Sequence, residues 1–148
     1  MVGKLLIATD GSKFSNKAVD YAIDLAKQLQ YEVLSLYVMN LKHFEVYALA
    51  HHDDITGYED EDIKLKKEGE DALAYVEQKG TEAGVPVTVK MVRGYPPEQI
   101  MKVAKDEGVN MIVVGHLGRT GIERILLGSV SEAVVRNAPC PVLVVRGK

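Results

Sequence analysis

The sequence has one cysteine, no tryptophan and no apolar stretch long enough to cross a membrane. A single cysteine excludes an internal disulfide, and the position of Cys140 between two prolines predicts a small packing residue rather than a redox thiol. Because no run reaches about 18 apolar residues, we expect no transmembrane helix. The stretch before Asp10 is too short for a secretory signal, so we expect a cytoplasmic location.

A strong excess of one charge is also missing. The net charge is only −3 over 148 residues, so the chain lacks the basic surface that attracts nucleic acids or anionic membranes. We therefore expect no nucleic-acid partner and no membrane partner. The length suits a single domain with its own hydrophobic core, spanning residues 1–148.

Short apolar runs alternate with helical patterns along the chain. Strands are predicted over residues 4–9, 32–38, 87–93, 111–115 and 142–146. Helices are predicted over residues 14–29, 59–83, 96–107 and 129–137. This alternation predicts right-handed crossovers and one doubly wound α/β domain, with a mostly parallel sheet of five strands and helices on both faces.

Several residues indicate where the predicted helices begin, end and face. Ser12 is a suitable N-cap for the first helix, and Gly108 follows the last turn of the third. The second helix is charged outside, and its narrow apolar face is expected to point inward. That face consists of Ile63, Ala72, Leu73 and Val76.

Two strands are expected at the edges of the sheet. The third alternates apolar residues with Thr88 and Lys90, as an edge strand does. The fifth, from Val142 to Val145, is apolar on both faces and is the last element of the chain. Since an uncovered apolar edge invites association, we expect a homodimer through this strand; the alternative is a strand covered by a helix.

Residues 40–58 have no clear periodicity and contain His51, His52, Asp53 and Asp54. Neighbouring histidines and carboxylates are compatible with a metal site, but the ligand spacing of a zinc site is missing. A solvated loop is therefore the favoured interpretation.

Two common nucleotide motifs are missing. The turn after the first strand, from Asp10 to Ser15, lacks the G-x-G-x-x-G of a dinucleotide site, and this disfavours NAD. No G-x-x-x-x-G-K-[ST] occurs, so the phosphate-loop lysine of many NTPases is missing too. The spaced glycines follow the fourth strand instead, at Gly115, Gly118 and Gly128.

Those glycines predict an anion site. Glycine lets backbone N–H groups approach phosphate oxygens without a Cβ in the way. Ser129 follows at the start of a helix, where we expect it to be the N-cap and to bind phosphate as well. In a sheet of order 3-2-1-4-5, strands one and four are neighbours whose connections leave in opposite directions. Asp10 and Gly115 are then expected to lie on opposite sides of one crevice.

These residues resemble the universal stress protein family, and specifically its ATP-binding branch, over essentially the whole chain. The spacing G-x2-G-x9-G-[ST] is met by Gly115, Gly118, Gly128 and Ser129. Further resemblance lies in residues 8–12, 94–98 and 139–145. The resemblance implies a five-stranded parallel sheet, a dimer through the last strand, and ATP in the crevice.

The resemblance also implies roles for individual residues. Asp10 would lie near the nucleoside with Ala8 and Thr9, and Val38 would offer backbone hydrogen bonds to adenine. The ribose and phosphates would be lined by Gly115, His116, Gly118 and Arg119. The phosphates would be held by Gly128, Ser129, Val130 and Ser131. His116 and Leu117 depart from the small, polar or basic residues common in the family. Structural alternatives remain: Asp10 as a cap, the glycines as turns and Arg119 as a solvated side chain.

We assign no catalytic residue, because no base, nucleophile or set of cations for phosphoryl transfer is recognisable. The expected function is an ATP-binding sensor or switch in a stress response, with at most weak ATPase activity. Mg²⁺ would accompany the triphosphate, held mostly by phosphates and water. The alternatives are a slow ATP hydrolase or nucleotidyl transferase, and a nucleotide-free dimeric interaction module.

Overall fold

The computed structural model describes residues 2–41, 45, 49, 55–116 and 128–146. It contains a five-stranded parallel sheet with the order β3-β2-β1-β4-β5. The strands are β1 (Lys4–Ala8), β2 (Glu32–Asn40), β3 (Val87–Gly94), β4 (Met111–Gly115) and β5 (Val142–Val145). The helices are α1 (Lys13–Leu29), α3 (Ile55–Ala83), α4 (Pro96–Glu107) and α5 (Ser129–Asn137). The predicted fold class and strand order are confirmed.

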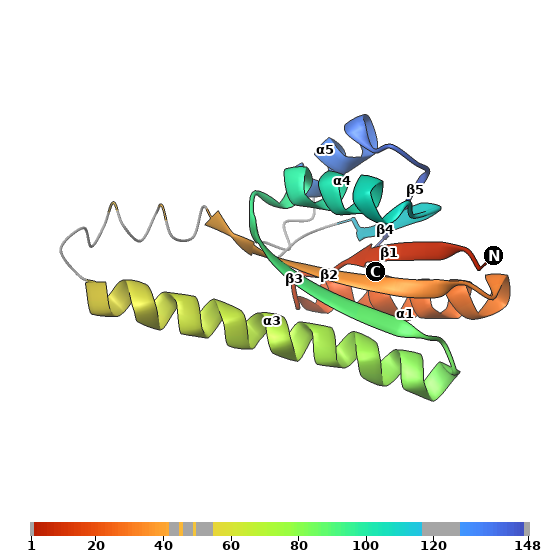
Figure 1. Ribbon diagram of the computed structural model, residues 1–148, viewed down its shortest axis with the longest axis horizontal. Helices are drawn as coiled ribbons and strands as arrows, with labels where there is room; N and C mark the ends of the chain where they lie inside the picture. The colour runs from red at the N-terminus through yellow and green to blue at the C-terminus, as the bar shows by residue number, and fades with distance from the viewer. Residues whose placement is uncertain (1, 42–44, 46–48, 50–54, 117–127, 147–148) are drawn as a thin grey trace.

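Helices cover both faces of the sheet, with α1 and α3 on one face and α4 and α5 on the other (Figure 1). Successive residues of a strand point to opposite faces. Leu5 and Ile7 of β1 therefore pack in one core with α1, whereas Leu6 packs in the other core with Ile100 of α4. All of these side chains are buried. The central strands are apolar on both faces because each face meets a layer of helices.

The predicted inner face of α3 is correct except at its first residue. Ala72, Leu73 and Val76 are buried as predicted, but Ile63 is 65% exposed, so its predicted inward position is wrong. Leu65 is buried instead. Residues 65, 72 and 76 share one helix face, whereas residue 63 lies about 200° around the helix from residue 65.

Two helix boundaries confirm the predicted chemistry. Ser12 is the N-cap of α1, and its Oγ accepts the Ser15 N–H at 3.1 Å. Gly108 is the C-cap of α4 and has the left-handed conformation, with φ 61°, that favours glycine. These caps fix where the chain enters α1 from β1 and where it leaves α4 toward β4.

The two predicted edge strands, β3 and β5, lie at the two ends of the sheet. Thr88 and Lys90 of β3 are exposed, whereas every residue of β5 is partly buried. Cys140, just before β5, packs partly buried against the core under α4 and α5. Burial raises the pKa of its thiol, as expected for a packing residue.

Several predictions fall on residues that the structure does not describe. These residues are His51, His52, Asp53 and Asp54, together with Gly118 and Arg119 of the glycine segment. Within the described ranges, no group of three or more His, Cys, Asp or Glu side chains could hold a metal ion. The helices in the same ranges include none with the length and apolar character needed to cross a membrane.

Candidate functional site

The turn between β1 and α1 is held together by its own side chains. Thr9 Oγ1 accepts the Gly11 N–H at 3.2 Å, and Asp10 Oδ1 accepts the Ser12 N–H at 2.9 Å. Ser15 Oγ accepts the Asp10 N–H at 3.1 Å. The helix cap is Ser12 and not Asp10, whose carboxylate instead holds the turn before the helix, and the role of Asp10 beside a nucleoside stays a prediction. Because these backbone amides are already hydrogen-bonded, this turn is poorly suited to receive an anion.

Gly11 brings the same turn against α3. Its φ of 80° is in the left-handed region, which glycine adopts without strain. A Cβ built on Gly11 would lie 3.4 Å from the Cβ of Ala72, so α3 limits the space for a larger side chain at this position.

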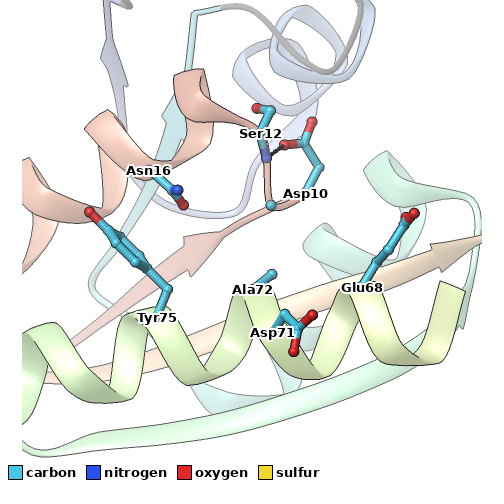
Figure 2. Close-up of a pocket in the computed structure, with 8 residues that line it drawn as sticks. Asp10, Ser12, Asn16, Glu68, Asp71, Ala72 and Tyr75 are labelled. Atoms are coloured by element: carbon cyan, nitrogen blue, oxygen red, sulfur yellow. Dashed lines mark hydrogen bonds between the residues drawn. The ribbon is translucent and has the colours of Figure 1, made fainter. Parts of the chain in front are cut away.

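A pocket of about 640 Å³ lies beside this turn, between the start of α1 and the middle of α3 (Figure 2). It is lined by Asp10, Gly11, Ser12, Asn16, Glu68, Asp71, Ala72 and Tyr75. Three of these residues carry carboxyl groups and none carries a positive charge, so the pocket disfavours a polyphosphate. The sequence analysis missed its α3 side because Glu68 and Asp71 have the pattern of a solvated helix face.

Tyr75 connects the outer wall of this pocket to α1. Its hydroxyl donates to Asp20 Oδ1 at 2.7 Å. Burial, followed by this hydrogen bond, raises the pKa of Tyr75 to about 12. The hydroxyl thus stays protonated at neutral pH and acts as the donor that joins α3 to α1.

The two ends of the glycine segment meet at the end of β4. The His116 C=O accepts the Gly128 N–H at 2.9 Å, and the His116 N–H donates to the Val145 C=O at 2.8 Å. Ser131 Oγ donates to the Gly115 C=O at 2.5 Å. His116 and Ser131 are both buried. The first turn of α5 is therefore tied to β4, and β4 to β5, at the carboxyl end of the sheet.

The start of α5 has no side-chain cap. Its N-cap is Gly128, whose C=O accepts the Glu132 N–H at 2.9 Å, so the predicted cap at Ser129 is wrong by one residue. The first N–H groups of a helix have no acceptor within the helix. At α5 these are the amides of Ser129, Val130 and Ser131. The nearby carboxylate of Glu132 is paired with Arg136 at 2.8 Å.

The backbone N–H and C=O of Val38 are directed toward the side of β2 on which β1 lies. The Leu36 C=O accepts the Thr9 N–H at 3.0 Å, so the backbone groups of Leu36 face β1. Residues two apart in a strand direct their N–H and C=O groups to the same side. Since β1 ends at Ala8, the N–H and C=O of Val38 point past its end.

The predicted switch point is present at the carboxyl end of the sheet. β1 and β4 are neighbours, with Ile7 opposite Val113, and their following helices α1 and α5 lie on opposite faces (Figure 1). Such points are where ligands bind in open α/β sheets. The predicted residues that the structure gathers here are Ala8, Thr9, Asp10, Val38, Gly115, His116, Gly128, Ser129, Val130 and Ser131.

Comparison with known proteins gives consistent matches. The family model described as "Universal stress protein family" matches residues 1–146. Universal stress protein MJ0531 of Methanocaldococcus jannaschii is 40% identical over 97% of this chain and 81% of its own. The structure of MJ0577, a universal stress protein of the same organism, has a TM-score of 0.83 at 30% identity and covers 100% of this chain and 98% of its own. A family protein from Arabidopsis thaliana with AMP bound has a TM-score of 0.72 at 19% identity, covering 99% and 92%, and this likeness shows the fold.

Proposed function

Because the chain belongs to the universal stress protein family, we propose that it binds ATP between β1 and β4 and acts as a nucleotide-dependent switch in a cytoplasmic stress response. The triphosphate would lie on the first turn of α5, and the nucleoside beside Asp10. Gly115, His116, Gly118 and Arg119 are proposed to line the ribose and the phosphates.

The observation that carries this proposal is the start of α5 on a glycine. Three consecutive amides, of Ser129, Val130 and Ser131, lack acceptors within the helix, and Gly128 has no side chain to occupy them. A phosphate at this position would accept from these amides and interact favourably with the helix dipole. The dipole term contributes about 0.3–1 kcal/mol at an exposed site, and each hydrogen bond to a charged group about 1.5–3 kcal/mol. With adenine burial, these terms support an affinity near micromolar, about −8 kcal/mol.

The nucleoside would lie on the opposite side of the crevice. The backbone N–H and C=O of Val38, directed past the end of β1, offer one donor and one acceptor at fixed positions, which suits the edge of adenine. Ala8 and Thr9 would form the floor beneath the ribose. Asp10, held by its bond to the Ser12 N–H, would present its carboxylate to ribose hydroxyls.

A Mg²⁺ ion is proposed to accompany the triphosphate. Within the described residues no cluster of three carboxylate, imidazole or thiol groups could hold a metal ion by itself. Mg²⁺ keeps several waters and is commonly bound through substrate phosphates. The ion would therefore be held by phosphate oxygens and water, and its binding would depend on the nucleotide.

A second copy of the chain is the proposed partner of β5. The Ile112 N–H donates to the Pro141 C=O and the His116 N–H to the Val145 C=O, so the backbone groups of Val142 and Val144 point away from β4. The two helices that contact β5 each carry an exposed apolar side chain, Tyr21 of α1 at 54% and Val135 of α5 at 45%. An unpaired apolar edge of this kind favours strand pairing with its twin.

Val144→Pro tests the dimer because it removes an outward N–H and leaves the bonds to β4 in place. We expect the purified variant to be monomeric by light scattering at micromolar concentration, whereas Val144→Thr, which keeps the N–H, stays dimeric. A dimeric Val144→Pro protein, or a monomeric wild type, would contradict the proposed interface.

Calorimetric titration and thermal unfolding with a panel of nucleotides test the ATP proposal. ATP at about one hundred times its Kd stabilises the protein by about 2.7 kcal/mol, which raises the melting temperature by several degrees. AMP belongs in the panel because the Arabidopsis relative has it bound. We expect ATP to bind more tightly than AMP, since AMP has one phosphate for the α5 amides. NAD and FMN are expected to bind weakly.

Small molecules released from freshly purified protein provide an independent check. Mass spectrometry is expected to detect an adenine nucleotide. If no nucleotide raises the melting temperature and none is released, the glycines are structural only and the chain is a nucleotide-free interaction module.

A further inference from the structure

Ser131 makes a hydrogen bond that gives its hydroxyl a different role from that of a phosphate ligand. Ser131 Oγ donates to the Gly115 C=O at 2.5 Å, and the residue is 7% exposed. A serine hydroxyl has one proton to donate. Since phosphate oxygens only accept, the Ser131 hydroxyl cannot donate to a phosphate while this bond is present.

The bond lies on the crevice side of β4. The His116 N–H donates to β5, and neighbouring residues of a strand direct their backbone groups to opposite sides. The C=O of Gly115 therefore faces the side of β1, beyond the point where β1 ends. Ser131 reaches this carbonyl from the first turn of α5, so its side chain joins the end of β4 to the start of that helix.

We infer that Ser131 is a positioning residue: its hydroxyl fixes the first turn of α5 against Gly115 and so directs the amides of Ser129 and Val130 toward the phosphates. This role rests on the proposed nucleotide function. The backbone N–H of Ser131 remains part of the phosphate site, and only the side chain is reassigned. A second hydrogen bond, from the Gly128 N–H to the His116 C=O at 2.9 Å, also joins the end of β4 to the start of α5.

The two hydrogen bonds depend on each other because both join the end of β4 to the start of α5. The bond from Gly128 is made by backbone atoms and persists in any variant whose local geometry is kept. The bond from Ser131 is made by a side chain, so a substitution removes it directly. Loss of the hydroxyl leaves the Gly115 C=O without its partner and lets the helix start move away from β4.

The test compares Ser131→Ala, Ser131→Thr and Ser129→Ala in two measurements. The first is ATP affinity by calorimetry, and the second is amide hydrogen exchange at Gly128 without nucleotide. Ser131→Ala is expected to weaken ATP binding about tenfold and to speed exchange at Gly128, with exchange in β1 and β2 unchanged. Ser131→Thr keeps a hydroxyl and is expected to restore both. Ser129→Ala is expected to leave exchange at Gly128 unchanged, whatever it does to ATP.

Two results would overturn the inference. If Ser131→Ala weakens ATP binding while exchange at Gly128 stays at the wild-type rate, the hydroxyl is a direct phosphate ligand. If neither the ATP affinity nor the exchange rate at Gly128 changes, the hydrogen bond from Ser131 to Gly115 does not position the start of α5. Should wild type fail to bind ATP, the proposed function fails, yet exchange at Gly128 still decides whether Ser131 holds the start of α5 against β4. If Ser131→Ala does not fold, Ser131→Cys replaces it, because its thiol is a weaker donor and predicts the same changes at smaller size.

Discussion

The helices α1 and α5 begin beside the carboxyl ends of the neighbouring strands β1 and β4, and their first turns are completed in different ways. At α1, Ser12 Oγ accepts the Ser15 N–H and Asp10 Oδ1 accepts the Ser12 N–H, so side chains occupy two amides at the helix start. At α5 the cap is Gly128, which has no side chain to do so. The difference shows which helix start is more open to an anion: that of α5, where no side chain occupies an amide of the first turn.

The charges around the two helix starts agree with this division. The start of α1 adjoins a pocket lined by Asp10, Glu68 and Asp71, without a cationic side chain among its lining residues. At the start of α5 the carboxylate of Glu132 is paired with Arg136, which reduces its repulsion of a bound anion. These charges favour the proposed arrangement, with the nucleoside beside the start of α1 and its phosphates at the start of α5.

The largest expected effect comes from giving α5 the kind of cap that α1 has. Gly128 has φ −60° and ψ 156°, which any residue adopts, so Gly128→Asp can place a carboxylate on the amides of Val130 and Ser131. We expect ATP affinity to fall at least about a hundredfold, because those amides become occupied and the added charge repels phosphate. The unfolding free energy is expected to stay equal or rise by a few tenths of a kcal/mol.

Gly128→Asn is the matched control, because it caps the helix without adding charge. We expect it to weaken ATP binding about tenfold, between wild type and Gly128→Asp. Calorimetry measures the ATP affinity of each variant, and urea unfolding measures its free energy of unfolding. Wild-type affinity in the aspartate variant would show that the α5 amides do not bind the phosphates.

The reverse change removes the cap of α1. Ser12→Ala is expected to cost about 1 kcal/mol of unfolding free energy, because the Ser15 N–H loses its acceptor. ATP affinity is expected to change by less than about threefold, since this turn donates no amide to phosphate. Ser12→Asp keeps the cap and serves as the control in urea unfolding. A tenfold loss of ATP affinity in Ser12→Ala would remove the distinction between the two helix starts.

The smallest effect concerns the support of α1 by α3 at high pH. Folding raises the pKa of Tyr75 from 10.0 to about 12, so its stabilising contribution is complete below pH 10 and is lost as pH rises toward about 12. Tyr75→Phe has no hydroxyl to ionise, so the stability difference between wild type and variant should shrink across this range. The hydrogen bond to Asp20 is exposed, and we expect it to contribute only about a few tenths of a kcal/mol to the free energy of unfolding. A difference that stays constant between pH 9 and 12 would show that the bond contributes nothing.

The fold and the switch point between β1 and β4 could be predicted from the sequence because they depend on local patterns of residues. Alternating strands and helices gave the parallel sheet, and Ser12 and Gly108 marked helix ends through caps that need only neighbouring residues. Ser129 was misplaced as a cap because serine is the usual choice there, while the backbone reaches its helical conformation one residue earlier, at Ser129 itself.

Other features depend on contacts between distant residues and could not be predicted. Ile63 fits an apolar helix pattern, and only the packing of Leu65 on β2 shows that the helix turns its other face inward. The pocket beside Asp10 requires α3 to cross the first turn at Ala72. The bond from Ser131 to Gly115 joins residues that are neighbours only once β4 and α5 have packed together.

Amide NMR spectra recorded with ATP and with adenosine test the central claim most directly. We predict that the difference between the two spectra, which isolates the phosphates, is concentrated at the amides of Ser129, Val130 and Ser131. The amides of Gly11, Ser12 and Ser15, which already have side-chain acceptors, are predicted to differ little. Phosphate-dependent shifts at the start of α1 without shifts at the start of α5 would contradict the account.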